Sequence, residues 1–155
     1  MENLKHFEKI LIAVDDSKYS YHAAAYGFDL AKKLNATVAL AHINELPVAV
    51  NITGDPILGD SGMMIPELLD IQKERAAALL QKIKTDFANG KDVKEFIVEG
   101  NITGQIVEIA KEFDASLIVM GTHGRTGFSH FISGSVAEQV TRHAKCPVLI
   151  VPDKD

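Results

Sequence analysis

The sequence has little cysteine and no long apolar run, and both absences exclude whole classes of protein. A single cysteine, Cys146, rules out an intramolecular disulfide, which fits a reducing compartment. The apolar runs at 117–120 and 148–151 are far shorter than the ~20 residues of a membrane-spanning helix. Residues 1–8 are polar and charged, unlike a secretory signal. We therefore expect a cytoplasmic protein that does not enter the membrane.

Positive charge is also scarce, which argues against a nucleic-acid partner. Lysine and arginine total 16 against 21 acidic residues, so the formal net charge is −5, and the basic residues are scattered. Nucleic-acid binding needs a basic patch or stripe, and none is evident. The 155 residues contain no obvious linker, and this length predicts a single domain over residues 1–155.

Strand-like and helix-like segments alternate along the chain. Short apolar runs predict strands, and apolar residues spaced by three and four predict helices. The predicted strands are 9–14, 37–43, 93–98, 116–120 and 147–152, and the predicted helices are 17–34, 66–88, 101–113 and 135–144. Because the strands are almost wholly apolar, we expect an α/β fold of Rossmann-like type, with an open parallel sheet and helices on both faces.

Residues 45–65 interrupt this alternation with a long segment rich in proline, glycine and aspartate. Loops beyond roughly 12–15 residues are uncommon unless they are functional or disordered. Two interpretations stay open: a flap over a ligand site, or a crossover without a role of its own.

The strongest functional signal follows the fourth predicted strand. Gly121 and Gly124 open a glycine-rich loop, and Gly134 and Ser135 precede the last predicted helix. Glycine lets the backbone turn tightly and approach a ligand, and the first amides of a helix lie unpaired at its positive end. The pattern therefore predicts a phosphate site. The alternative is that the glycines only shape a turn and Ser135 only caps the helix.

Several other polar residues lie at or near the ends of the predicted strands and are candidates for the same site. Asp15 and Asp16 follow the first predicted strand and point to opposite sides in an extended chain, so Asp15 is expected to face the crevice and Asp16 or Ser17 to cap the next helix. His42 lies inside a strand and is interpreted as a satisfied core histidine. His123 and Arg125 either contact phosphate or are solvent-exposed loop residues.

These motifs together resemble one known family. The spacing G-x-x-G-x9-G-[ST], matched by Gly121, Gly124, Gly134 and Ser135, resembles the ATP-binding signature of the universal stress protein family. The segments 10–17, 41–43, 117–127 and 143–152 resemble further family motifs in the same order. The resemblance implies a five-stranded parallel sheet of order 3-2-1-4-5 that binds ATP. Many ATP-binding members have proline where this chain has Ala13.

The resemblance also implies a role for each matching position. Asp15 would face the ribose or adenine. The adenine pocket would be lined by Ala13, Val14, Ile43 and Met120. The ribose and phosphates would be surrounded by Gly121, His123, Gly124, Arg125, Gly134, Ser135 and Val136. A magnesium or manganese ion can arrive with the triphosphate and be held mainly by its phosphates.

The function implied by the resemblance is an ATP-dependent sensor or signalling protein in the stress response. No general base is evident, so at most slow ATP hydrolysis is expected. Two alternatives stay open: a protein-interaction module in which the nucleotide is incidental, or a slow ATP-hydrolysing enzyme. The family also implies a homodimer in which the last predicted strand, an edge strand with unpaired backbone groups, pairs with its twin.

Overall fold

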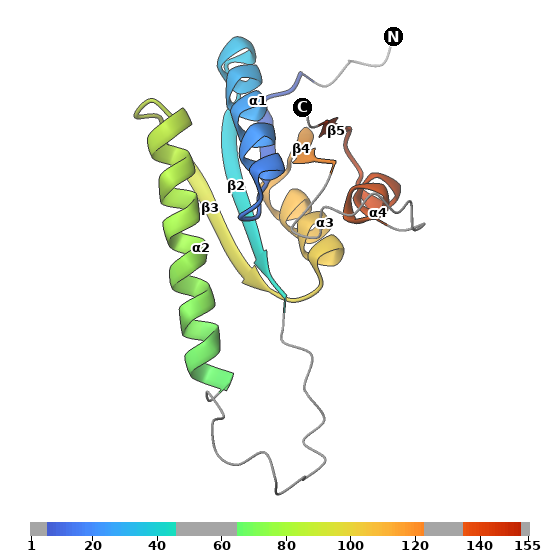
Figure 1. Cartoon of the computed structure of the whole chain (residues 1–155). Helices are drawn as coiled ribbons and strands as arrows, with labels where there is room; N and C mark the ends of the chain where they lie inside the picture. The colour runs from blue at the N-terminus through green and yellow to red at the C-terminus, as the bar shows by residue number, and fades with distance from the viewer. Residues whose placement is uncertain (1–5, 46–64, 123–134, 153–155) are drawn as a thin grey trace, which may run out of the picture.

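The computed structural model describes residues 6–45, 65–122 and 135–152, which form five strands and four helices (Figure 1). The strands are β1 (Lys9–Ala13), β2 (Thr37–Asn44), β3 (Val93–Glu99), β4 (Leu117–Gly121) and β5 (Val148–Val151). The helices are α1 (Lys18–Leu34), α2 (Ile65–Phe87), α3 (Ile102–Phe113) and α4 (Val136–His143). Each boundary lies within one residue of its predicted position, so the predicted alternation is confirmed. Within the described ranges, no helix combines the length and the apolar character needed to cross a membrane.

All strands belong to one parallel sheet, in the order β3-β2-β1-β4-β5. From β1 the chain moves outward through β2 to β3, then crosses back through α3 to β4 and continues outward to β5. The order therefore reverses between β1 and β4. The strand order implied by the family resemblance is confirmed. In sheets of this kind, ligands bind beyond the carboxyl ends of the strands at the point of reversal.

The helices cover the two faces of the sheet in pairs, with α1 and α2 on one face and α3 and α4 on the other (Figure 1). Across the first face, the Tyr21 hydroxyl of α1 donates a hydrogen bond of 2.5 Å to Asp86 Oδ2 of α2. This hydrogen bond, together with burial and the Asp86 charge, raises the pKa of Tyr21 above its ordinary value. The bond ties the two helices to each other.

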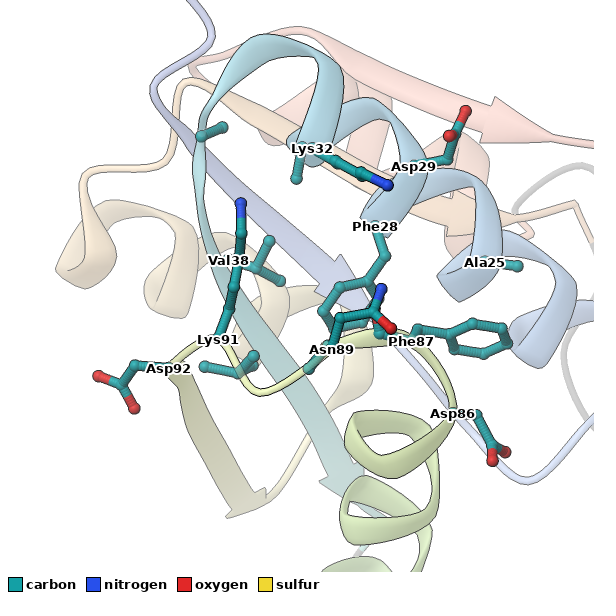
Figure 2. A pocket seen from close by; sticks show the side chains of 14 residues that line it. Ala25, Phe28, Asp29, Lys32, Val38, Asp86, Phe87, Asn89, Lys91 and Asp92 are labelled. Atoms are coloured by element: carbon teal, nitrogen blue, oxygen red, sulfur yellow. The ribbon is translucent and has the colours of Figure 1, made fainter.

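A hollow of about 400 Å³ lies between the C-terminal ends of α1 and α2 (Figure 2). Its walls include Phe28 and Phe87, whose ring centroids are 6.1 Å apart. Val38 and Val93, near the starts of β2 and β3, line the same hollow. The hollow is therefore at the amino ends of the strands, away from the edge where the strand order predicts a ligand.

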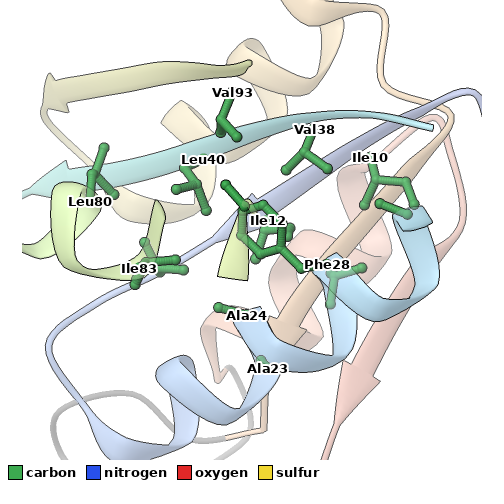
Figure 3. Packing of buried hydrophobic residues seen from close by; sticks show 14 of the residues in the cluster. Ile10, Ile12, Ala23, Ala24, Phe28, Val38, Leu40, Leu80, Ile83 and Val93 are labelled. Carbon is green, nitrogen blue, oxygen red and sulfur yellow. The ribbon is translucent and has the colours of Figure 1, made fainter. Parts of the chain in front are cut away.

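The core is divided between the two faces because successive strand residues point to opposite sides. Ile10 and Ile12 pack toward α1 and α2, with Leu40, Leu80 and Ile83 around them (Figure 3). The residue between them, Leu11, packs in the cluster under α3 and α4, and it is fully buried as well. Burial on both faces explains why the central strands β1, β2 and β4 are almost continuously apolar, whereas the edge strand β3 also carries exposed charged residues.

Gly27 of α1 marks the closest approach of a helix to the sheet. A Cβ added there would lie 2.6 Å from Ile12 Cδ1 and 2.9 Å from Ile12 Cγ1. Ile12 is fully buried, so a shift of its side chain would disturb the residues packed around it. We predict that Gly27→Ala lowers the free energy of unfolding by about 1–3 kcal/mol in chemical denaturation, because overcrowding outweighs the gain in helix propensity.

Gly104→Ala is the matched control for this prediction. A Cβ at this exposed position of α3 would meet Asn101 Oδ1 at 3.4 Å, an ordinary contact distance. We expect its stability to equal or exceed that of the wild type. A Gly27→Ala variant as stable as Gly104→Ala would contradict the close packing of α1 on β1.

Candidate functional site

The carboxyl ends of β1 and β4 lie side by side where the strand order reverses. Ile12 pairs with Val119 in register, so Ala13 and Met120, the next residue of each strand, are neighbours. Ala13 also pairs with Ala41 of β2, which places Ile43 two residues further along that strand. The structure thus brings Ala13, Ile43 and Met120 from three adjacent strands to one edge of the sheet.

These three residues share a face of the sheet, and a fourth predicted site residue joins them. Ala13, Ile43 and Met120 are buried in the cluster under α3 and α4, and Val136, the first residue of α4, packs against the same cluster. Val14 does not share this surface, because its side chain is buried in the opposite cluster under α1 and α2. The apolar part of the candidate site therefore combines three strand ends with the start of α4.

Asp15 is held in place by the first turn of α1. Its amide donates a hydrogen bond of 2.7 Å to Ser20 Oγ, and its Oδ1 accepts one of 2.9 Å from the Ser17 amide. Ser17 Oγ in turn accepts from the Ser20 amide at 3.1 Å and caps the helix, so Ser17 rather than Asp16 is the cap. Within the described part of the chain no group bonds Asp15 Oδ2, so this oxygen can accept a hydrogen bond from a ligand.

The start of α4 carries Ser135, which caps the helix. Its Oγ accepts a hydrogen bond of 3.2 Å from the Glu138 amide. Ser135 is exposed, so its hydroxyl proton can still be donated to a ligand. Glu138 lies in this first turn, where its charge competes with an anion, but Arg142 Nη2 pairs with it at 2.8 Å. Ser135 can therefore cap α4 with its hydroxyl oxygen and still donate its hydroxyl proton to a ligand.

The loop between β4 and α4 is only partly described. Gly121 ends β4 opposite Val151 of β5, and the Thr122 amide donates to the Val151 carbonyl at 3.1 Å. The predicted phosphate-site residues His123, Gly124, Arg125 and Gly134 lie outside the described residues, as does most of the long segment 45–65, for which a flap and a crossover without a role both stay open. Among the described residues, no three or more His, Cys, Asp or Glu side chains are grouped so that they could hold a metal ion.

His42 is a satisfied core histidine, as predicted. It is 8% exposed, and its ring nitrogens contact the Val14 carbonyl and the Asn44 side chain. The sequence analysis missed Ser20, which holds the Asp15 amide. Ser20 lies on the buried face of α1 with Ala23 and Ala24, so a hydroxyl on an otherwise apolar helix face was the available signal.

The comparisons with known proteins agree with this fold. The model of the Universal stress protein family matches residues 6–152, so the chain belongs to the universal stress protein family. Universal stress protein MJ0531 of Methanocaldococcus jannaschii is 35% identical over 150 residues, which cover 97% of this chain and 84% of that protein.

Solved structures show the same architecture. Universal stress protein UspA from Lactobacillus plantarum has a TM-score of 0.77 at 23% identity, covering 94% of this chain and 98% of that one. A universal stress protein solved in complex with cAMP has a TM-score of 0.67 at 25% identity, covering 96% of this chain and 99% of that one. The first comparison supports the fold alone, and the second is a similar protein with an adenine nucleotide bound.

Ser20→Ala tests whether Ser20 holds the strand end. The change leaves the Asp15 amide without its acceptor in a partly buried position, beside the buried Ser20, which is 4% exposed. We predict that the free energy of unfolding falls by about 1–3 kcal/mol and that the Asp15 amide exchanges faster with deuterated water.

Asn101→Ala provides the control for Ser20→Ala. It removes the cap of α3, where Asn101 Oδ1 accepts from the Gly104 amide at 2.9 Å, and costs about 1 kcal/mol. We expect it to leave the local exchange of Asp15 unchanged. Equal Asp15 exchange rates in the two variants would show that Ser20 does not hold this amide.

Proposed function

We propose that this protein binds an adenine nucleotide, with ATP as the expected ligand, and acts as a nucleotide-dependent sensor or signalling protein in the stress response. The observation that carries the proposal is the edge of the sheet where the strand order reverses. There the apolar residues Ala13, Ile43 and Met120 lie beside Asp15, whose Oδ2 has no described partner. A similar family member solved with cAMP supports the same class of ligand.

The base and ribose would lie against the strand ends. A purine ring has apolar faces, which suit the surface made by Ala13, Ile43, Met120 and Val136. Asp15 Oδ2, which has no hydrogen-bond partner among the described residues, suits a ribose hydroxyl or the amino group of adenine, because both are hydrogen-bond donors. Val14 would contribute through the position of its backbone only, since its side chain packs on the other face.

The phosphates would lie at the start of α4. The helix offers unpaired amides at its positive end and the Ser135 hydroxyl. The loop glycines Gly121, Gly124 and Gly134 would let the backbone approach, while His123 and Arg125 would supply donors or charge. A magnesium or manganese ion would be held chiefly by the phosphates themselves.

The proposed role is binding rather than fast catalysis. Asp15 is the carboxylate that we place in the site, and its Oδ1 is engaged by the Ser17 amide. It would face the base and ribose rather than the phosphates. A general base must reach the attacking water, and the carboxylate in the first turn of α4, Glu138, is instead paired with Arg142 at 2.8 Å. A bound nucleotide would therefore act mainly through its presence or absence.

Isothermal titration with ATP tests the proposed site. We predict that Gly124→Asp and Gly134→Val weaken ATP binding at least about tenfold, or ~1.4 kcal/mol, because each places bulk or negative charge against the phosphates. Gly104→Ala, in the exposed part of α3, is the control and should bind like the wild type. Equal affinities in the wild type and both loop variants would refute the site, and mass spectrometry of co-purified nucleotide would identify the natural ligand.

We also propose that the protein forms a homodimer through β5. This strand lies at the edge of the sheet and carries Leu149, which is 37% exposed. An apolar edge strand presents unpaired backbone groups that a second copy can pair with.

Light scattering tests the dimer. We predict a mass twice that of one chain at micromolar concentration, and dissociation by Leu149→Lys, which would bring like charges together across the interface. Leu34→Lys replaces another exposed leucine, at the end of α1, and should leave the dimer intact. A wild type with the mass of a single chain would contradict this proposal.

A further inference from the structure

His42 links the ends of two strands beside the proposed site. Its Nδ1 lies 2.9 Å from the carbonyl oxygen of Val14, and its Nε2 lies 3.1 Å from Asn44 Oδ1. His42 and Asn44 are only 8% and 7% exposed, so neither hydrogen bond is replaced by water. Val14 is the residue that connects β1 to Asp15, so His42 holds the peptide from which Asp15 extends.

The hydrogen bond between His42 Nδ1 and the Val14 carbonyl is the same whether the ring is neutral or an imidazolium. A carbonyl oxygen only accepts, so Nδ1 must carry a proton to bond Val14. If the ring is neutral, Nε2 is an acceptor and needs a donor, which the Asn44 amide provides when its Nδ2 turns toward the ring. If the ring is an imidazolium, Nε2 donates to Asn44 Oδ1. The bond from Nδ1 to Val14 is the same in both states.

Asn44 can therefore orient the His42 ring in either charge state, because its side-chain amide offers both a donor and an acceptor. Its Nδ2 is buried and has no hydrogen-bond partner among the described residues when Oδ1 faces His42. An unpaired buried amide group is costly, so a half-turn of the side chain that brings Nδ2 to the ring is favoured by the neutral histidine. The result is a chain of hydrogen bonds from Asn44 through His42 to Val14.

The strand end is thus held from two directions. On the β2 side, the Val14 amide donates to the Ala41 carbonyl at 2.9 Å, and the Val14 carbonyl accepts from His42. On the α1 side, the Asp15 amide donates to Ser20 Oγ at 2.7 Å. With the peptide on both sides of Val14 fixed, the Asp15 carboxylate has little freedom before a ligand arrives. Such preorganisation lowers the entropic cost of binding.

We infer that His42 is a positioning residue for nucleotide binding: it sets the orientation of Asp15 through the Val14 carbonyl, with Asn44 setting the orientation of the ring. The inference rests on the proposed function, because Asp15 is the residue that the nucleotide would meet. His42 does not touch the ligand itself. Its strand neighbours Ala41 and Ile43 point to the α3 and α4 face, and His42 points to the face of α1 and α2.

Three variants distinguish a role of His42 in orienting Asp15 from a general effect on the stability of the fold. His42→Leu removes the donor to Val14, whereas His42→Asn keeps an amide donor close to the position of Nδ1. Val93→Ala destabilises the same face of the sheet at the start of β3, far from the strand end. ATP affinity is measured by titration calorimetry at a temperature where all variants are folded, and exchange of the Asp15 amide is measured by NMR without nucleotide.

We expect His42→Leu to weaken ATP binding about tenfold and to speed Asp15 exchange. His42→Asn should restore most of the ATP affinity and most of the Asp15 protection from exchange. Val93→Ala should change neither the ATP affinity nor the Asp15 exchange rate. If His42→Leu does not fold, Asn44→Ala should shift both readouts in the same direction by a smaller factor. Ring nitrogen shifts of the wild type should show a proton on Nδ1 of His42.

The outcomes distinguish this inference from the proposed function. Wild-type protein that fails to bind ATP would refute the proposed function. The Asp15 exchange rates and the Nδ1 proton would then still decide whether His42 holds the strand end. Wild-type affinity and wild-type Asp15 protection in His42→Leu, or in Asn44→Ala in its place, would overturn the positioning role. An affinity loss in Val93→Ala equal to that in His42→Leu would do the same.

Discussion

The pairing of β1 with β4 is the constraint on which the candidate site depends. The chain returns from β3 across the sheet and places Ile12 beside Val119, so two strands whose connections leave in opposite directions end next to each other. α1 follows one strand on one face, and α4 is reached from the other strand on the opposite face. Sheets of this kind bind ligands in the crevice between the connection that follows β1 and the connection that follows β4.

Hydrogen bonding at this edge complements the apolar packing of the strands. The central strands are buried and apolar along most of their length, and the buried polar side chains of the described residues, Ser20, His42 and Asn44, lie near the ends of β1 and β2. There Ser17, Ser20 and His42 satisfy the backbone and side-chain groups around Asp15. Because these partners come from the protein itself, the carboxylate is oriented before any ligand binds. The candidate site would therefore be built into the fold rather than assembled by a ligand.

Sequence patterns predicted the helices and strands, because most strands are apolar runs and each helix carries one apolar stripe, whereas the strand order was implied by the family resemblance. The patterns did not predict hydrogen bonds between side chains and backbone groups of different helices and strands. Ser20 acts on Asp15 across a turn, and Asn44 acts on Val14 through a third residue, so neither role follows from local spacing. Val14 was grouped with Ala13, although the alternation of strand side chains places them on opposite faces.

An NMR titration with ATP tests where on the fold the proposed nucleotide binds. We predict that amide shifts change first and most at Asp15, Gly121 and Val136, around the edge where the strand order reverses. Changes centred on Phe28 and Phe87, which line the hollow at the opposite end of the sheet, would contradict it. So would the absence of any change at millimolar nucleotide.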